Sequence, residues 1–217
     1  QTILLIWDPK VEMVAAGTAN SCTIYKVRLG DLPDGLGPCT GWLTVPNDTS
    51  KKYPADALFY GYENSWSSDN RKKPTTADRT KIQFRVMAHA FELEQDAAYY
   101  ADFKAGTQSR GKTHGLDPVQ NTNPLTSYFN GMACRDIRAM LFLKTLEAWN
   151  GTELTTTGHS QGGLQSIWGA ALVPGVSKLD IYIPWCCNVG GTEDGRNRGD
   201  WYVKWAPGLD YYDPVNM

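Results

Sequence analysis

The stretch Leu154-Thr155-Thr156-Thr157-Gly158-His159-Ser160-Gln161-Gly162-Gly163 joins a β-prone run to a glycine-rich corner. In the segment that follows, apolar residues recur at the three- and four-residue spacing of an α-helix, at Leu164, Ile167, Trp168 and Ala171. This order predicts a strand, a sharp turn and a helix. Ser160 stands at the centre of the turn, with a glycine two positions away on each side.

A serine at such a turn is a candidate nucleophile, because the strained backbone projects its hydroxyl above the end of a sheet. The flanking positions must be small, and Gly158 and Gly162 meet that demand. The turn also puts the backbone N–H of Gln161 at a helix N-terminus, where unpaired donors stabilise a negative oxygen. We therefore predict Ser160 as the nucleophile and Gln161 as one oxyanion donor.

A second oxyanion donor is expected from the loop after an earlier central strand. Two apolar runs predict such buried strands, Ala55 to Tyr60 and Ile82 to Ala88. The first run is followed directly by Gly61 and Tyr62. We therefore predict that the backbone N–H of Tyr62 is the second donor.

The remaining patterns alternate between strand and helix. Alternating residues predict an antiparallel pair of strands at 22–29 and 40–45, and a further short strand at 179–184. Helical spacing predicts an amphipathic helix over 125–149 that stops at Asn150-Gly151, whereas 65–81 and 92–124 resemble long surface loops. We expect one α/β domain over 1–217, with the α/β-hydrolase fold and a doubly wound, mainly parallel sheet.

The base and the acid of a catalytic triad are missing from the pattern. In this fold they follow the serine in the order acid, then histidine. The histidines are His89 and His114, which precede Ser160, and His159, whose side chain should point away from it. We expect all three to be structural, and without a later histidine no acid is assigned.

Composition excludes several classes of partner. With 21 basic and 23 acidic residues the net charge is −2, and no basic run is long enough to bind nucleic acid. The apolar stretches are too short to span a membrane. Five scattered cysteines predict free, mostly buried thiols, with core packing for Cys186 and Cys187. We expect neither a metal nor a cofactor, and the compartment stays open.

Six segments together resemble the acetylxylan esterase and cephalosporin-C deacetylase family, in order over most of the chain. They are Gly41–Pro46, Tyr53–Ala55, Gly61–Tyr62, Cys134–Ala139, Gly158–Gly163 and Tyr211–Asn216. The resemblance implies a serine esterase that removes acetyl groups from small sugars or similar esters. It places the nucleophile on Ser160 and the oxyanion donors on Tyr62 and Gln161, and it implies a homo-oligomer.

The chain departs from that family at its end. In the family, a segment like Tyr212-Asp213-Pro214-Val215-Asn216 is followed by a strand with the triad Asp and later by the triad His, whereas this sequence stops at Met217. The family also usually has more sequence before the first strand. We therefore expect an internal part of a longer chain, with a sheet that is incomplete at its C-terminal end.

Two alternatives stay open. One is a different serine hydrolase on the same fold, such as a peptidase or a lactone hydrolase, because a fold does not determine its substrate. The other is a non-catalytic binding protein that keeps the turn only as a structural element. The absence of a histidine after Ser160 is the reason to retain this second alternative.

Overall fold

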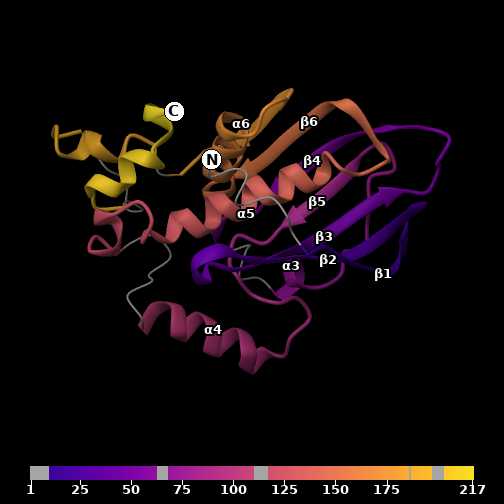
Figure 1. Ribbon diagram of the computed structural model, residues 1–217, viewed down its shortest axis with the longest axis horizontal. Coiled ribbons are helices and arrows are strands. Elements are labelled where there is room, and N and C mark those ends of the chain that lie inside the picture. The colour runs from indigo at the N-terminus through magenta and orange to yellow at the C-terminus, as the bar shows by residue number, and fades with distance from the viewer. Residues whose placement is uncertain (1–9, 63–67, 110–116, 186, 197–202) are drawn as a thin grey trace.

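The structure is a computed structural model that describes residues 10–62, 68–109, 117–185, 187–196 and 203–217. Among these residues, seven strands form one sheet in the order β1-β2-β3-β5-β4-β6-β7 (Figure 1). The strands are β1 (Glu12–Ala19), β2 (Cys22–Leu32), β3 (Gly37–Pro46), β4 (Tyr53–Phe59), β5 (Ile82–Val86), β6 (Trp149–His159) and β7 (Lys178–Tyr182). The helices are α3 (Ser68–Arg71), α4 (Ala97–Ser109), α5 (Tyr128–Leu143) and α6 (Gln161–Leu172).

The strand pairing in the sheet changes from antiparallel to parallel at β5. The pairs β1–β2, β2–β3 and β3–β5 are antiparallel, whereas β5–β4, β4–β6 and β6–β7 are parallel. This confirms the antiparallel pair predicted at the start of the chain and the central strands predicted at 55–60 and 82–88. Because parallel strands end at one edge of a sheet, the loops that follow β4 and β6 come together there.

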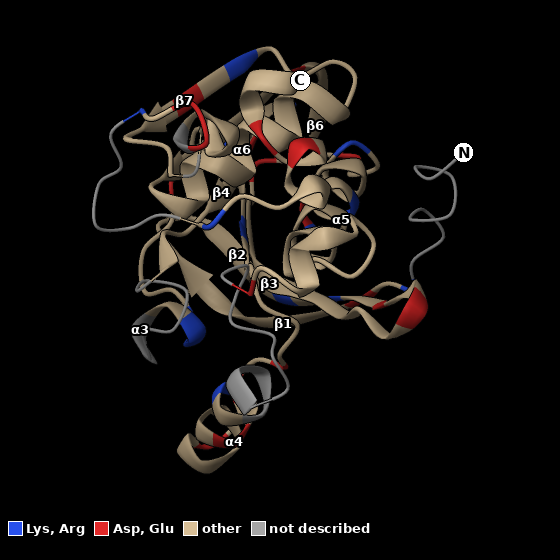
Figure 2. Cartoon of the chain, turned by 90° about the vertical axis from the view of Figure 1, so that its left-hand side faces the viewer, with Lys and Arg blue, Asp and Glu red and all other residues tan. Residues whose placement is uncertain are grey.

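Helices cover both faces of the sheet, as a doubly wound fold requires. The helices α5 and α6 lie together on one side, and α4 lies on the other (Figure 1, Figure 2). Neighbouring residues of β3 point to opposite faces, so Leu43 joins the core with Ile137 of α5 and Trp42 joins a second core with Tyr100 of α4. Each face of the sheet therefore has its own hydrophobic core.

The helix predicted over 125–149 is shorter than expected. It begins at Tyr128, after Ser127 accepts the N–H of Phe129, and it ends at Leu143. The predicted stop at Asn150-Gly151 is wrong, because Trp149 already belongs to β6 and pairs with Tyr53. The apolar residues that extended the helical pattern, Leu146, Ala148 and Trp149, pack against the sheet core instead.

Asn150 and Gly151 form a turn inside β6. The Oδ1 atom of Asn150 accepts the N–H groups of Thr152 and Glu153 at 3.1 and 2.9 Å, and Gly151 has a φ of 83°. A short polar side chain followed by a glycine is typical both of a helix end and of a turn, so sequence alone does not separate the two.

The surface loop predicted over 92–124 contains α4 and a 3-10 turn at Gln120–Thr122. Three aromatic residues at helical spacing, Tyr99, Tyr100 and Phe103, form the apolar side of α4. The rings of Tyr100 and Phe103 lie 5.4 and 5.9 Å from that of Phe91. This stripe is short and is surrounded by polar residues, which obscured it in the sequence pattern.

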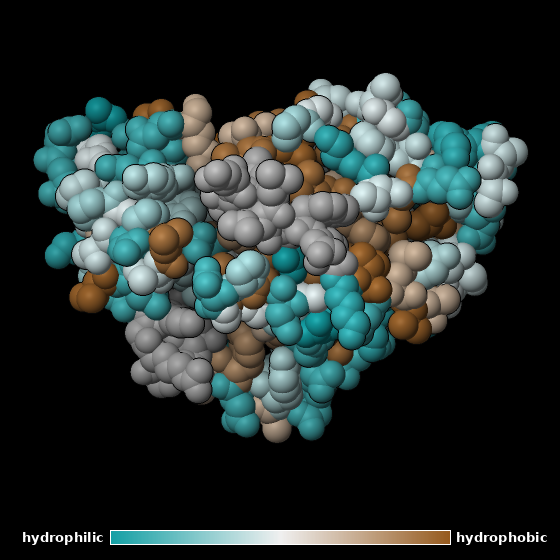
Figure 3. All heavy atoms as spheres, in the orientation of Figure 1, coloured by the Kyte–Doolittle hydropathy of each residue, from teal (hydrophilic) through white to brown (hydrophobic). Residues whose placement is uncertain are grey.

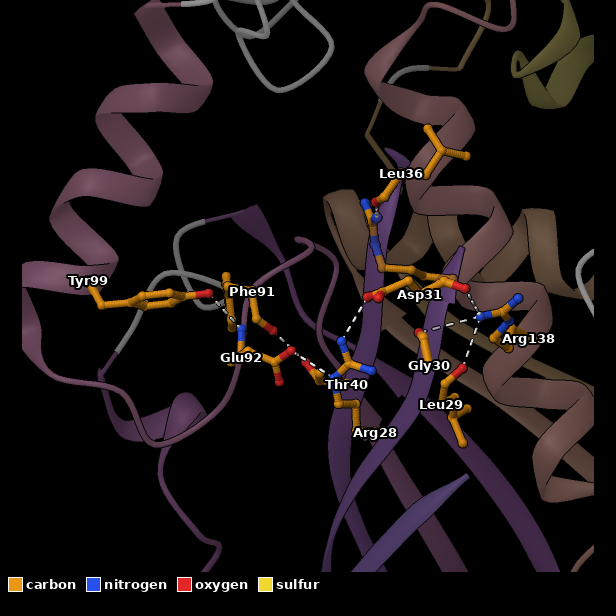
Figure 4. A network of polar contacts seen from close by, with 11 residues as sticks. Arg28, Leu29, Gly30, Asp31, Leu36, Thr40, Phe91, Glu92, Tyr99 and Arg138 are labelled. Atoms are coloured by element: carbon orange, nitrogen blue, oxygen red, sulfur yellow. Dashed lines mark hydrogen bonds and ion pairs between the residues drawn. The ribbon is translucent and has the colours of Figure 1, made fainter. Parts of the chain in front are cut away.

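Two arginines connect the end of β2 to neighbouring elements (Figure 4). Arg138 of α5 is buried, and its Nη1 donates to the carbonyl groups of residues 29, 30 and 31 at 2.9, 3.4 and 2.9 Å. Arg28 donates to Glu92 at 2.8 Å and to Asp31 at 2.7 Å. These bonds hold β2 against α5 and hold the segment after β5 against β2.

Of the cysteines that the structure describes, Cys22, Cys39 and Cys134 are buried free thiols, as predicted. Cys187 is exposed, so its predicted core position is wrong, whereas Cys186 lies outside the described residues. The next residue, Asn188, adopts a left-handed conformation with a φ of 59° and precedes the 3-10 turn Val189–Thr192.

The described surface carries mixed charge. Basic and acidic residues are scattered over several elements in the view of Figure 2. Apolar side chains are also exposed on both outer strands, among them Val14 of β1 and Tyr182 of β7, and Figure 3 shows hydrophobic atoms among hydrophilic ones on one face. Within the described residues, no cluster of three metal-binding side chains occurs, and no helix has the length and apolarity to cross a membrane.

Candidate active site

Ser160 lies in a strained turn between β6 and α6. Its backbone has φ 54° and ψ −118°, a combination that side chains rarely adopt. The turn is held at three points: the Ser160 N–H donates to the carbonyl of Tyr182 at 3.1 Å, and the Ser160 carbonyl accepts from Trp185 and Leu164 at 3.0 and 3.2 Å. A non-glycine residue persists in such a conformation only when its surroundings enforce it, which is typical of a functional site.

The two flanking glycines are packed against backbone. A Cβ atom at Gly158 would overlap the carbonyl of Gly162, and one at Gly162 would overlap the carbonyl of Phe59 at the end of β4. The turn therefore brings α6 into direct contact with β4. Any larger residue at either position would force the helix away from the sheet.

The loop after β4 lies against the same turn. A Cβ atom built on Gly61 would stand 3.1 Å from the carbonyl oxygen of His159 and 3.7 Å from Cβ of Ser160. The structure thus brings Gly61, and with it the half-buried Tyr62, next to Ser160. The role of the Tyr62 N–H as an oxyanion donor stays a prediction.

Gln161 is the first residue of α6 and is 1% exposed. Its position gives its backbone N–H no partner within the helix, because the first N–H groups of a helix have no carbonyl before them. The partial positive charge at this helix end favours a negative oxygen beside Ser160. The side-chain amide of Gln161 is buried without a hydrogen-bond partner among the described residues.

His89 is fully buried, and its ring contacts that of Tyr62. Its Nδ1 and the hydroxyl of Tyr128 share a hydrogen bond of 2.7 Å, and its ring meets that of Tyr62 edge-on at 6.3 Å. Burial raises the pKa of Tyr128 to about 12, so this hydroxyl stays protonated at neutral pH. His89 therefore contacts the loop that carries Tyr62, and its structural role stays a prediction.

The other two histidines occupy different surroundings. His159 is exposed, and its ring stacks on that of Tyr182 with centroids 5.4 Å apart. Both residues line a hollow of about 240 Å³ at the ends of β4, β6 and β7. His114 lies outside the described residues. In the part of the chain that the structure describes, no histidine forms a hydrogen bond with Ser160 Oγ.

Asp213 is a buried structural carboxylate. It is 3% exposed, and it accepts the backbone N–H groups of Asn188, Val189 and Val215 at 2.7, 2.5 and 3.1 Å. These bonds join the segment after β7 to the last described turn. Asp210 accepts from Trp205 Nε1 at 2.9 Å. Neither carboxylate contacts a described histidine.

Replacing Asp213 by Ala should destabilise the fold by about 2–4 kcal/mol, because three backbone N–H groups, one of them buried and two partly buried, would lose a charged acceptor. Asp194→Ala is a matched control: Asp194 is exposed, and its one ion pair among the described residues is a 3.6 Å contact with Arg196, so its loss should change stability by less than about 0.5 kcal/mol. Urea unfolding of both variants measures the difference. Equal stability of the two variants would contradict the structural role of Asp213.

The elements beneath the turn contain a polar pair that the sequence analysis did not single out. Gln165 of α6 donates to Asp136 of α5 at 2.9 Å, and both side chains are fully buried. Asp136 lies four residues from Met132 and from Met140, on the apolar side of its helix. An acidic residue among apolar ones on a helix is the sequence signal that could have indicated this buried pair.

Residues 19–194 match the family model of acetyl xylan esterase (AXE1). The chain belongs to the acetyl xylan esterase family. The match includes Ser160, Tyr62 and Gln161, and it confirms the family that the sequence segments resembled. Membership of this family supports a hydrolase of the carboxylesterase type that acts on sugar esters.

Solved structures are similar in fold. Acetyl xylan esterase 1 from a Thermoanaerobacterium species has a TM-score of 0.68 and 17% identity, over 96% of this chain and 68% of that one. An acetyl xylan esterase from a Paenibacillus species has a TM-score of 0.66 and 18% identity, and the match covers 99% of this chain and 72% of that one. The glucuronoyl esterase from Solibacter usitatus has a TM-score of 0.50 and 14% identity, and the match covers 97% of this chain and 61% of that one. The α/β-hydrolase fold predicted from the sequence is thereby confirmed.

Proposed function

We propose that this member of the acetyl xylan esterase family is a serine esterase that hydrolyses acetyl esters of small sugars or similar alcohols. The observation that supports this most directly is the strained backbone of Ser160, φ 54° and ψ −118°, at the N-terminus of α6. This conformation holds a hydroxyl oxygen at the edge of the sheet, beside the first N–H groups of a helix. Both features serve attack on an ester carbonyl.

The proposed reaction begins when Ser160 Oγ forms a bond to the ester carbonyl carbon and its proton passes to a base. The carbonyl oxygen becomes negative and accepts hydrogen bonds from the N–H groups of Gln161 and Tyr62. Collapse of this intermediate breaks the bond to the sugar oxygen, which takes up the proton and leaves. Water then hydrolyses the acetyl-serine by the same steps and releases acetate.

The base and acid of this reaction remain unassigned. A general base must come within hydrogen-bond reach of the hydroxyl that it activates. Among the described residues, neither His89 nor His159 forms a hydrogen bond with Ser160. His89 bonds to Tyr128 through Nδ1, and His159 stacks on Tyr182. The proposal therefore assigns only the nucleophile and the oxyanion donors.

A fluorophosphonate probe tests the nucleophile directly, because it forms a covalent bond only with an activated serine. We expect peptide mass spectrometry to place the probe on Ser160 and not on Ser50, an exposed serine that is hydrogen-bonded to Asp48. No labelling of Ser160 in the folded protein would contradict the proposal and favour a non-catalytic binding role.

A substrate panel separates the proposed activity from other serine hydrolases. The protein should cleave p-nitrophenyl acetate and acetylated xylose, with much slower turnover of long-chain esters, lactones and aminoacyl substrates. A preference for aminoacyl substrates or lactones would replace the acetyl esterase proposal by a peptidase or a lactone hydrolase.

A further inference from the structure

Asp136 is a buried acid without a cationic partner among the described residues. It is 0% exposed, in the middle of α5. Its neighbour Arg135 is also buried, but that guanidinium donates elsewhere, from Nε to the carbonyl of Ala88 at 3.0 Å and from Nη1 to that of Leu36 at 2.8 Å. An ionised carboxylate without a partner is costly in such surroundings, so a buried acid is usually paired or protonated.

The hydrogen bonds of Asp136 and Gln165 are incomplete if the acid is ionised. The amide nitrogen of Gln165 donates to Oδ1 of Asp136 at 2.9 Å. The two remaining oxygens, Oδ2 of Asp136 and Oε1 of Gln165, are buried and have no hydrogen-bond partner among the described residues. Both are acceptors when Asp136 is charged, and a single proton on Oδ2 can satisfy both of them.

We propose that Asp136 keeps its proton at neutral pH and donates it from Oδ2 to Oε1 of Gln165. The acid and the amide are then joined by two hydrogen bonds, one in each direction, across the interface of α5 and α6. A planar carboxylic acid and a planar primary amide are complementary in this arrangement, because each offers one donor and one acceptor.

The surroundings of Asp136 agree with a neutral acid. Burial, the largest effect, raises the pKa of Asp136 to about 8, against the opposing effects of the Gln165 hydrogen bond and the Arg135 charge. The other titratable groups that interact with it are the thiols of Cys39 on β3 and Cys134 on α5. Burial raises the pKa of both thiols, that of Cys39 to about 12, so they are neutral and do not stabilise a charged acid.

The pair also links α5 to the proposed oxyanion site, and this step rests on the proposed function. Gln165 lies one helical turn after Gln161 on the same side of α6. Because Gln165 is bonded to α5, the pair limits the movement of the first turn of α6. We assign Asp136 and Gln165 as positioning residues for the Gln161 N–H.

If Asp136 is protonated in the folded protein, its contribution to stability must depend on pH. The pKa of Asp136 is higher in the folded chain than in the unfolded chain, where it is about 3.9. Its contribution to stability is therefore complete below about pH 4 and is lost progressively as the pH rises to the folded pKa. Asn resembles the neutral acid, since its amide nitrogen can donate to Gln165 while its oxygen accepts, but it does not titrate.

The experiment compares urea unfolding of the wild type and of Asp136→Asn from about pH 5 to about pH 9. We expect the ratio of their unfolding constants to change about tenfold per pH unit in favour of the variant as the pH rises, and to become constant above about pH 8. A ratio that stays constant over the whole range would overturn the proposal, because Asp136 would then be ionised in the folded protein.

A second measurement uses the wild type alone, in case Asp136→Asn does not fold. In protein labelled with 13C at the Asp carboxyl carbon, one signal should have the chemical shift of a protonated acid at neutral pH and should move only near pH 8. If every Asp signal in the folded protein shows an ionised carboxylate at neutral pH, the proposal is wrong.

The positioning role of Asp136 is tested separately, by the kcat values of its variants. Asp136→Ala should lower kcat for p-nitrophenyl acetate at least tenfold with little change in KM, and Asp136→Asn should restore most of it. Equal kcat values in all three proteins would overturn the positioning role. If the wild type has no esterase activity, the proposed function fails, whereas the unfolding and NMR measurements still decide the protonation of Asp136.

Discussion

Replacement of Ser160 by Ala should lower kcat/KM for p-nitrophenyl acetate by about 10⁴-fold or more, because the covalent route through an acyl-enzyme is lost. The oxyanion donors are backbone groups and would remain in place, so substrate should still bind with a similar KM. The variant should have about the same stability as the wild type, because Ala keeps the Cβ atom and the backbone conformation at φ 54° is equally strained in both proteins. Steady-state kinetics and urea unfolding measure both effects.

The matched control for this experiment is Ser50→Ala. Ser50 is exposed and bonds only to Asp48 through its side chain, far from α6 in the chain, so activity should not change. If Ser160→Ala retained activity within about tenfold of the wild type, Ser160 would not be the nucleophile. If Ser50→Ala lost activity as well, the loss would report on folding and not on chemistry.

Replacement of Gly162 by Ala should destabilise the protein by about 2–4 kcal/mol and reduce its activity. Helix propensity alone predicts the opposite sign, because Ala stabilises a helix by about 1 kcal/mol relative to Gly. The steric effect is larger, since a Cβ atom at Gly162 would overlap the carbonyl of Phe59. The helix would have to move away from β4, and the adjacent N–H of Gln161 would move with it.

Gly190→Ala controls for the loss of a glycine. A Cβ atom at Gly190 would meet Trp205 at 3.6 Å, which is an ordinary contact. The stability of the Gly190→Ala variant should therefore stay within about 0.5 kcal/mol of the wild type. Urea unfolding and esterase kinetics of the two variants give the comparison. A stabilised Gly162→Ala protein with full activity would show that α6 does not depend on this contact.

The turn around Ser160 was predictable because its requirements are local. A β-prone run, two small residues and an amphipathic segment occur within about one strand and one helix, as the fold's nucleophile turn requires. The structure has the strand, the turn and the helix where the sequence placed them, with α6 beginning at Gln161. The family match then confirmed the fold and the family, whereas the roles of Ser160, Tyr62 and Gln161 stay predictions.

Other elements depend on contacts between distant residues, and there the sequence was insufficient. Leu146 and Trp149 continue the helical pattern of α5 but pack against the sheet, because Trp149 pairs with Tyr53. The helix α4 depends on aromatic contacts with Phe91, which follows β5. In both cases tertiary packing, and not local propensity, decided the element.

The sequence by itself determined the turn at Ser160 and the strands that surround it, since these follow from short patterns of small, apolar and β-branched residues. The family was indicated by the resemblance of six segments to it. Only the tertiary structure decided which distant groups meet: Gly61 against Ser160, His89 against Tyr128, and Asp136 against Gln165. The reason is physical, because burial and hydrogen bonding between elements depend on strand order and helix packing, which no local pattern contains.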